Sequence, residues 1–171
     1  MEELYSGHGW QVVLQEKELP DGRIKKAARA KRADSVILLA FPTDDTILIL
    51  REYRPYYGEY LWMLPSGNMD KENDMMVAAL RELREETGFQ ADEVTHYCDA
   101  NVSESLILTH HVFIAKKLSP NPLPQYDDEM IEVHTIKLEE ALEKILTSPK
   151  VHMPSAFALM KYLHEHATIQ P

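Results

Sequence analysis

The chain has 171 residues, of which 44% are hydrophobic and 27% charged, and this is enough for one globular domain with a sizeable core. Its formal net charge of −10 argues against a general nucleic-acid-binding protein, because binding to phosphate backbones requires clustered lysine and arginine. Cys98 is the sole cysteine, which excludes an internal disulfide and a cysteine-rich zinc site. We find no signal peptide and no apolar run near the ~20 residues of a membrane span, and therefore expect a cytoplasmic protein.

Residues 1–33 predict an N-terminal β extension. Within it, residues 8–30 are typical of two strands around the turn sequence LPDG, which makes a hairpin. Trp10 lies on the first of these strands. Its indole could stack on the base of a ligand, or it could simply pack against the fold.

Residues 34–42 form a continuous apolar run that predicts a buried central strand, and residues 46–54 predict a second strand after a short turn. Arg51 and Arg54 lie where this second strand leaves the core. A guanidinium can bind phosphate oxygens in a bidentate way that lysine cannot. The alternative is that these arginines form ion pairs with Glu52, with Glu59 or with the acidic helix that follows.

A helix is predicted to begin near Asn73 or Asp74, either of which could cap it, and to end before Gly88 at a left-handed position. Its expected buried stripe consists of five apolar residues. These are Met75, Met76, Ala79, Leu80 and Leu83.

Three glutamates on this helix suggest a metal site. Glu82, Glu85 and Glu86 are spaced i, i+3 and i+4, so their carboxylates project from one face of one turn. Like charges at this spacing repel, and a bound divalent cation would remove the repulsion, with Mg2+ or Mn2+ preferring such oxygen ligands. The alternative interpretation is a charged helix face that is merely solvated.

Residues 90–118 predict a strand, a polar loop containing Glu104, and another strand. His110 and His111 are adjacent on that strand, so their side chains should point to opposite faces, one buried and one exposed, without a shared metal. An acidic loop with Asp127, Asp128 and Glu129 follows. Two amphipathic helices, 138–148 and 154–167, should then flank the sheet.

Residues 67–89 resemble the Nudix box, whose pattern is Gly, five residues, Glu, seven residues, Arg-Glu, an aliphatic residue, any residue, Glu-Glu, any residue, Gly and an apolar residue. The residues in register are Gly67, Arg81, Glu82, Leu83, Glu85, Glu86, Gly88 and Phe89. One position departs, because the first glutamate of the pattern is Asn73 and Glu72 is displaced by one residue. In the family that glutamate braces the loop by pairing with the arginine, here Arg81, so we expect a less rigid loop.

This resemblance implies roles for individual residues. Glu82, Glu85 and Glu86, together with the backbone carbonyl of Ser66, would hold one to three Mg2+ or Mn2+ ions. Gly67 would lie against the substrate, and Arg81 and Gly88 would be structural. Either Glu104 or a carboxylate of the acidic loop, for which Asp128 and Glu129 are candidates, would accept a proton from the attacking water.

The sequence REYRP before the box is similar to that of the ADP-ribose pyrophosphatase branch, in which such arginines hold the diphosphate. The resemblance implies an α/β Nudix fold, with a mixed β-sheet between helices in residues 34–171. It also implies a homodimer that exchanges its N-terminal strands, so that Trp10 could act in the neighbouring site. The implied reaction is hydrolysis of ADP-ribose to AMP and ribose 5-phosphate.

Two departures leave other functions open. Met63 replaces a glutamate of the branch, and the Ser-Pro-Gly that precedes the loop glutamate is missing before Glu104. The substrate could therefore be another sugar nucleotide or a dinucleotide. A non-hydrolytic nucleotide-binding module is a further alternative, supported only by Asn73.

Overall fold

The computed structural model describes residues 1–123 and 130–167. Its strands are β1 (Glu2–Gly7), β2 (Trp10–Glu18), β3 (Ile24–Lys31), β4 (Ser35–Ala40), β5 (Thr46–Arg54), β6 (Glu59–Met63), β7 (Ser66–Asn68), β8 (Phe89–Ala100), β9 (Leu106–Ile107), β10 (His110–Pro120) and β11 (Ile131–Lys137). Its helices are α1 (Met75–Thr87), α2 (Leu138–Leu146) and α3 (Met153–Ala167). The strands form three sheets, ordered β1-β2-β3-β9, β7-β4-β10-β8 and β11-β5-β6.

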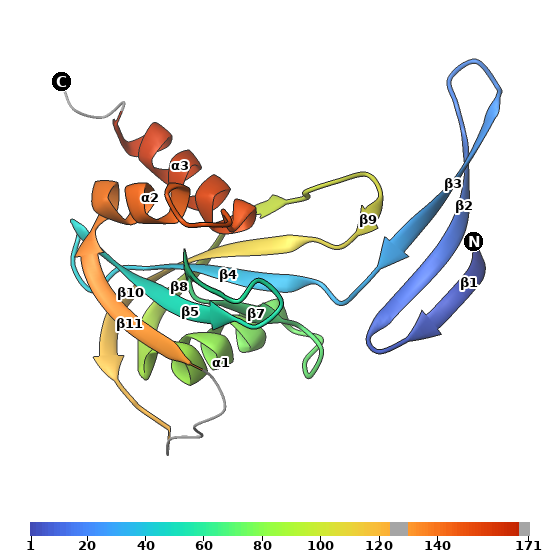
Figure 1. Ribbon diagram of the computed structural model, residues 1–171. Coiled ribbons are helices and arrows are strands. Elements are labelled where there is room, and N and C mark those ends of the chain that lie inside the picture. Colours follow the sequence, from blue (N-terminus) through green and yellow to red (C-terminus); the bar gives the residue numbers. More distant parts are fainter. Residues whose placement is uncertain (124–129, 168–171) are drawn as a thin grey trace.

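The central layer consists of the last two sheets, with α1 on one side and α2 and α3 on the other (Figure 1). The sheet around β4 is mixed, because β4 pairs with β10 in parallel and with β7 antiparallel. The α/β arrangement between helices is therefore confirmed. The expectation of one mixed sheet needs a correction, since β5 hydrogen-bonds to β6 and β11 in a separate antiparallel sheet.

Strand β4 divides the core in two. Every residue of β4 is buried, and alternate side chains face opposite helix layers. Ile37 and Leu39 pack on the side of α2 and α3, whereas Val36 and Leu38 pack on the side of α1. Burial of each such side chain stabilises the fold by about 1.5–3 kcal/mol. This strand fixes the position of the loop and helix that carry the acidic residues.

Helix α1 begins and ends as the sequence predicts. The side chain of Asp74 caps it by accepting from the N–H groups of Met76 and Val77 at 2.8 and 3.2 Å. Gly88 ends it with a φ of 72°, in the left-handed region, and donates to the carbonyl of Arg84.

The expected apolar stripe of α1 is only partly correct. Ala79 and Leu83 are buried, as is Ala78, and Met76 packs against the same core. Met75 and Leu80, however, are 40% and 37% exposed. The buried arc is centred instead on Ala79, Glu82 and Leu83, because the side chain of Glu82 also turns inward.

The N-terminal extension stands to one side of the central layer (Figure 1). The predicted hairpin is present as β2 and β3, but the extension has a third strand, since β1 pairs antiparallel with β2. A turn at His8 and Gly9, both with positive φ, joins β1 to β2. Strand β9, which follows the loop of Glu104, adds to β3 in parallel.

Within residues 1–123 and 130–167, no helix combines the length and the apolar character that crossing a membrane requires.

Candidate functional site

An acidic pocket of about 290 Å³ lies between the end of β5, strand β7 and helix α1. Five carboxylates line it, opposed by three basic side chains. The acidic residues are Glu52, Asp70, Glu82, Glu85 and Glu86, and the basic residues are Arg54, Lys71 and Arg81. The three glutamates of the predicted metal site therefore share one cavity. Such a cavity suits a divalent cation together with an anionic ligand.

Gly67 allows the helix to approach β7 closely. A Cβ atom on Gly67 would lie 1.9 Å from Cδ of Glu82, which leaves no room for any side chain. Glu82 is itself only 9% exposed. The glycine of the box is thus required because the carboxylate of Glu82 occupies the space in front of it.

Arg81 braces the loop between β7 and α1. Its Nε lies 2.6 Å from Oε1 of Glu72 and its Nη2 lies 3.1 Å from Oε2, so the pair is bidentate. Nη2 also donates to the carbonyl of Asn68 at 3.2 Å. The expectation of a loosened loop was wrong, because Glu72 pairs with the arginine even though Asn73 occupies the usual glutamate position.

The same guanidinium holds two of the three glutamates. Nη1 of Arg81 lies 2.7 Å from Glu82 and 2.6 Å from Glu85, while Glu86 accepts from the backbone N–H of Ser66 at 2.7 Å. Burial raises the pKa of Glu82, and the charge of Arg81 opposes that shift. Three carboxylates within about one turn of the same helix, beside the backbone of Ser66, offer the all-oxygen donor set that Mg2+ and Mn2+ prefer. The residues present therefore fit the expected metal.

The two predicted phosphate-binding arginines lie on opposite faces of β5. Arg54 lines the acidic pocket, 2.9 Å from Oε2 of Glu52 and 3.1 Å from the sulfur of Met63. Arg51 instead pairs with Glu132 at 2.7 Å and lies over the ring of Tyr60 at 4.1 Å. The described structure thus brings Arg54, but not Arg51, to the glutamates.

A second cavity of about 240 Å³ adjoins the acidic pocket, with Arg54, Ser66 and Gly67 lining both. His110 and His152 contribute to it, together with other polar groups. Burial lowers the pKa of His110 and lowers that of His152 to about 4, so both imidazoles are neutral at pH 7.

Sequence reasoning missed both histidines of this second cavity. Strand alternation correctly separates His110 from its neighbour His111, but the expectation of one buried and one exposed side chain was wrong, because both are partly exposed. Their nearness to Arg54 could not be read from the sequence, because residue 152 lies about a hundred positions further along the chain.

Of the remaining predicted residues, Glu104 and Trp10 do not line the acidic pocket. The backbone carbonyl of Glu104 accepts from Arg29, and Glu104 lines a separate cavity beside β2 and β3. Trp10 is 38% exposed, and the guanidinium of Arg32 lies 5.3 Å from its ring centre. Asp127, Asp128 and Glu129 fall outside the described residues.

Comparisons with known proteins identify the family of the chain. The family model of the NUDIX domain matches residues 31–156. The ADP-ribose pyrophosphatase of Bacillus subtilis (strain 168) is 28% identical over 175 residues, which covers 99% of this chain and 92% of that protein. The methanol dehydrogenase activator of Bacillus methanolicus is 27% identical over 150 residues, covering 84% of this chain and 80% of that protein.

Among solved structures, that of an ADP compounds hydrolase superposes with a TM-score of 0.76 at 22% identity, covering 98% of this chain and 94% of that one. This similarity concerns the fold. The family match spans most of the chain, including β4, the acidic pocket and the helix that carries the three glutamates. The chain therefore belongs to the Nudix family of hydrolases.

Proposed function

We propose that this protein hydrolyses the diphosphate bond of ADP-ribose to give AMP and ribose 5-phosphate, in a reaction that depends on Mg2+ or Mn2+. The observation that carries the proposal is the acidic pocket, in which Glu82, Glu85 and Glu86 lie beside the Ser66 backbone and the guanidinium of Arg54. Similarity to the ADP-ribose pyrophosphatase of Bacillus subtilis along almost the whole chain supports the choice of substrate.

Glu82, Glu85 and Glu86 would hold the metal together with the carbonyl of Ser66. When bound, a divalent ion lowers the pKa of a coordinated water and neutralises charge on the phosphate oxygens. Arg81 keeps Glu82 and Glu85 on one side of the pocket through its Nη1 contacts of 2.7 and 2.6 Å. The chain thereby supplies carboxylates that are already oriented.

Arg54 would bind the diphosphate, since its guanidinium reaches the pocket and is held in place by Glu52 and Met63. Water would attack one phosphorus, the bridging P–O bond would break, and the proton of the water would pass to a carboxylate base. Glu104, Asp128 and Glu129 are still the predicted bases. Arg51 and Trp10 remain predicted substrate contacts. Because neither lines the acidic pocket, contact with the substrate would require either a rearrangement of these side chains or a second subunit.

The adjoining cavity would accept the other half of the substrate. His110 and His152, both neutral through burial, offer ring nitrogens that can hydrogen-bond to ribose hydroxyls without attracting a second anion. Met63 supports a second candidate substrate class, because its thioether occupies the position where the ADP-ribose branch has a carboxylate. The second candidate is hydrolysis of another sugar nucleotide or of a dinucleotide. The non-hydrolytic alternative loses its support, because Glu72 forms the ion pair with Arg81 that Asn73 cannot form.

We further propose that the enzyme is a homodimer joined through its N-terminal sheet. Large apolar side chains are exposed on that sheet, as a partner surface requires. These are Leu4, Tyr5, Trp10 and Ile24. The boundary between an extension at residues 1–33 and a hydrolase domain at 34–171, and the cytoplasmic location, remain predictions.

The test is phosphate release from a panel of nucleoside diphosphate derivatives, coupled to a phosphatase, with Mg2+, with Mn2+ and with EDTA. We expect metal-dependent cleavage that is fastest with ADP-ribose. Faster cleavage of another sugar nucleotide or a dinucleotide would support the second candidate. Absence of metal-dependent cleavage across the panel would contradict the proposal.

A further inference from the structure

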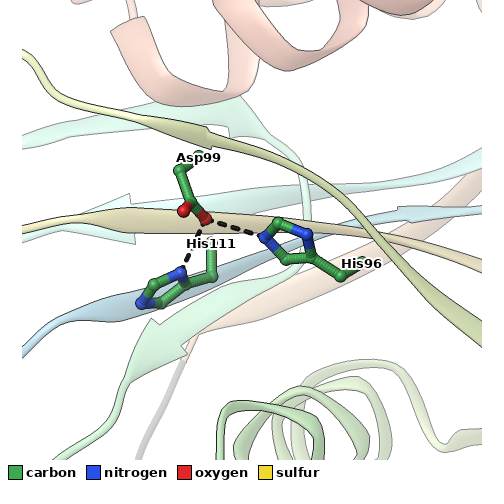
Figure 2. A group of neighbouring side chains, drawn as sticks. All are labelled: His96, Asp99 and His111. Carbon is green, nitrogen blue, oxygen red and sulfur yellow. Dashed lines mark hydrogen bonds and ion pairs between the residues drawn. The ribbon is translucent and has the colours of Figure 1, made fainter.

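Three potential metal ligands converge on strands β8 and β10, apart from the acidic pocket. Nε2 of His96 and Nδ1 of His111 each lie 2.7 Å from the same oxygen of Asp99 (Figure 2). Their ligand atoms all lie within 4.8 Å of one another. Among the residues that the structure describes, no other set of three or more His, Cys, Asp or Glu side chains brings its ligand atoms this close together.

A β-bulge creates this convergence. In a regular strand, His96 and Asp99 would point to opposite faces, because they are three positions apart. The pairing of β8 with β10 shifts register, so that Val112 pairs with Cys98 whereas Phe113 pairs with His96, and one extra residue is inserted in β8. The insertion returns His96 to the face of Asp99, which is itself paired with His111.

The rings of both histidines are oriented by neighbouring side chains. Nε2 of His111 lies 3.7 Å from Oδ2 of Asp34, whose other oxygen accepts from the N–H of Thr109 at 2.7 Å. Histidine ligands commonly direct the nitrogen that does not bind the metal at a carboxylate in this manner. His96 packs its edge against the ring of Phe113 at 5.4 Å.

Solvent reaches two of the three proposed ligands. The side chain of His111 is only 15% exposed, whereas those of His96 and Asp99 are 39% and 52% exposed. One ligand is therefore anchored in the sheet and two open to solvent, so a cation can enter and water can complete its coordination. Asp99 and Asp34 supply negative charge to attract it.

The donor set differs in kind from that of the acidic pocket. Two imidazoles and one carboxylate favour Zn2+ and related transition metals, whereas all-oxygen sets favour Mg2+ and Mn2+. We propose that His96, Asp99 and His111 bind a divalent transition-metal ion of the Zn2+ class. The bound ion links β8 to β10 across the bulge and stabilises the folded state. It acts independently of the ion used for hydrolysis.

The experiment is a calorimetric titration of the full chain with Zn2+, in a large molar excess of Mg2+ that occupies the acidic pocket. We expect His96→Gln and His111→Gln each to weaken Zn2+ binding by at least about tenfold, and Asp34→Asn to weaken it by about tenfold. The matched control is His134→Gln, because His134 is half-exposed and lies 3.4 Å from the single carboxylate of Glu132. That variant should bind Zn2+ as the wild type does.

Two further readouts separate binding from folding. Metal-free melting temperatures verify that each variant is folded, and His96→Gln is the safer variant because its side chain is the more exposed of the two histidines. In histidine side-chain NMR spectra, Zn2+ should shift the signals of His96 and His111 and leave that of His134 in place. Equal Zn2+ affinity of wild type and both ligand variants, or unshifted signals for His96 and His111, would overturn the proposal.

Discussion

The pairing of Arg81 with Glu72 predicts that Glu72, and not Asn73, braces the site. Both partners are largely buried, with side chains 17% and 19% exposed, and two charge-assisted hydrogen bonds of 2.6 and 3.1 Å join them. Glu72→Gln removes the charge and one of the two acceptor oxygens. A hydrogen bond to a charged group contributes about 1.5–3 kcal/mol, so we expect the free energy of unfolding to fall by about 2 kcal/mol.

Such a loss lowers the melting temperature by about 4–8 °C for a domain of this size. Asn73→Gln is the matched control, because Asn73 is exposed and neighbours the same turn, and its effect should stay within about 0.5 kcal/mol. Urea unfolding of the wild type and both variants measures the difference. Activity should fall in parallel for Glu72→Gln, since Arg81 also orients Glu82 and Glu85.

Two results would refute this reasoning. One is that Glu72→Gln unfolds at the same urea concentration as the wild type. The other is that Asn73→Glu gains stability. We expect no gain, because the guanidinium of Arg81 already pairs with Glu72 and an added carboxylate at position 73 would have no arginine to pair with.

Further predictions concern the pocket and its surroundings. Gly67→Ala should abolish metal-dependent hydrolysis, since a Cβ there would lie 1.9 Å from a glutamate carbon, whereas Ser66→Ala, which keeps the backbone carbonyl, should stay active in the same assay. Arg54→Lys should lower kcat/KM more than Arg51→Lys, because Arg54 alone of the two lines the acidic pocket; equal losses in steady-state kinetics would contradict this. Burial lowers the pKa of His152 from 6.5 to about 4, so the unfolded state takes up a proton that the folded state rejects between these pH values. Stability should therefore fall as the pH is lowered from 6.5 to 4, by about 3 kcal/mol from this residue, and urea unfolding of His152→Gln should show a weaker pH dependence.

The local signals of the sequence predicted much of the fold. Asp74 and Gly88 fix the ends of α1 through hydrogen bonds to neighbouring backbone groups. Such short-range interactions can be predicted from the sequence. The continuous apolar run at residues 34–42 likewise identified the buried strand β4. The spacing of the three glutamates placed them on one helix face.

Other features depend on contacts that no local pattern reveals. Glu72 replaces a missing glutamate because the loop can present a neighbouring residue to Arg81, and loop geometry is set by the packed structure. The convergence of His96 with Asp99 depends on a bulge that breaks strand alternation. By contrast, the separation of Arg51 from Arg54 could have been predicted, since residues three apart on a strand face opposite sides, although both arginines were expected at the diphosphate.

The third strand of the N-terminal sheet was also missed. Strand β1 is almost entirely exposed, so its residues lack the alternation of apolar and polar side chains that signals a half-buried strand. The available signal was the sequence Gly7-His8-Gly9, because glycine readily adopts the positive φ of tight hairpin turns.

The central claim is that the glutamates of α1 hold the ion that drives hydrolysis. The most direct measurement is the rate of ADP-ribose cleavage by wild type and Glu86→Gln at saturating Mg2+, with AMP and ribose 5-phosphate quantified as products. We expect the variant to lose about 100-fold or more in kcat while keeping the melting temperature of the wild type, because a catalytic metal supplies several kcal/mol of transition-state stabilisation. A folded variant that cleaves ADP-ribose at the wild-type rate would contradict the claim.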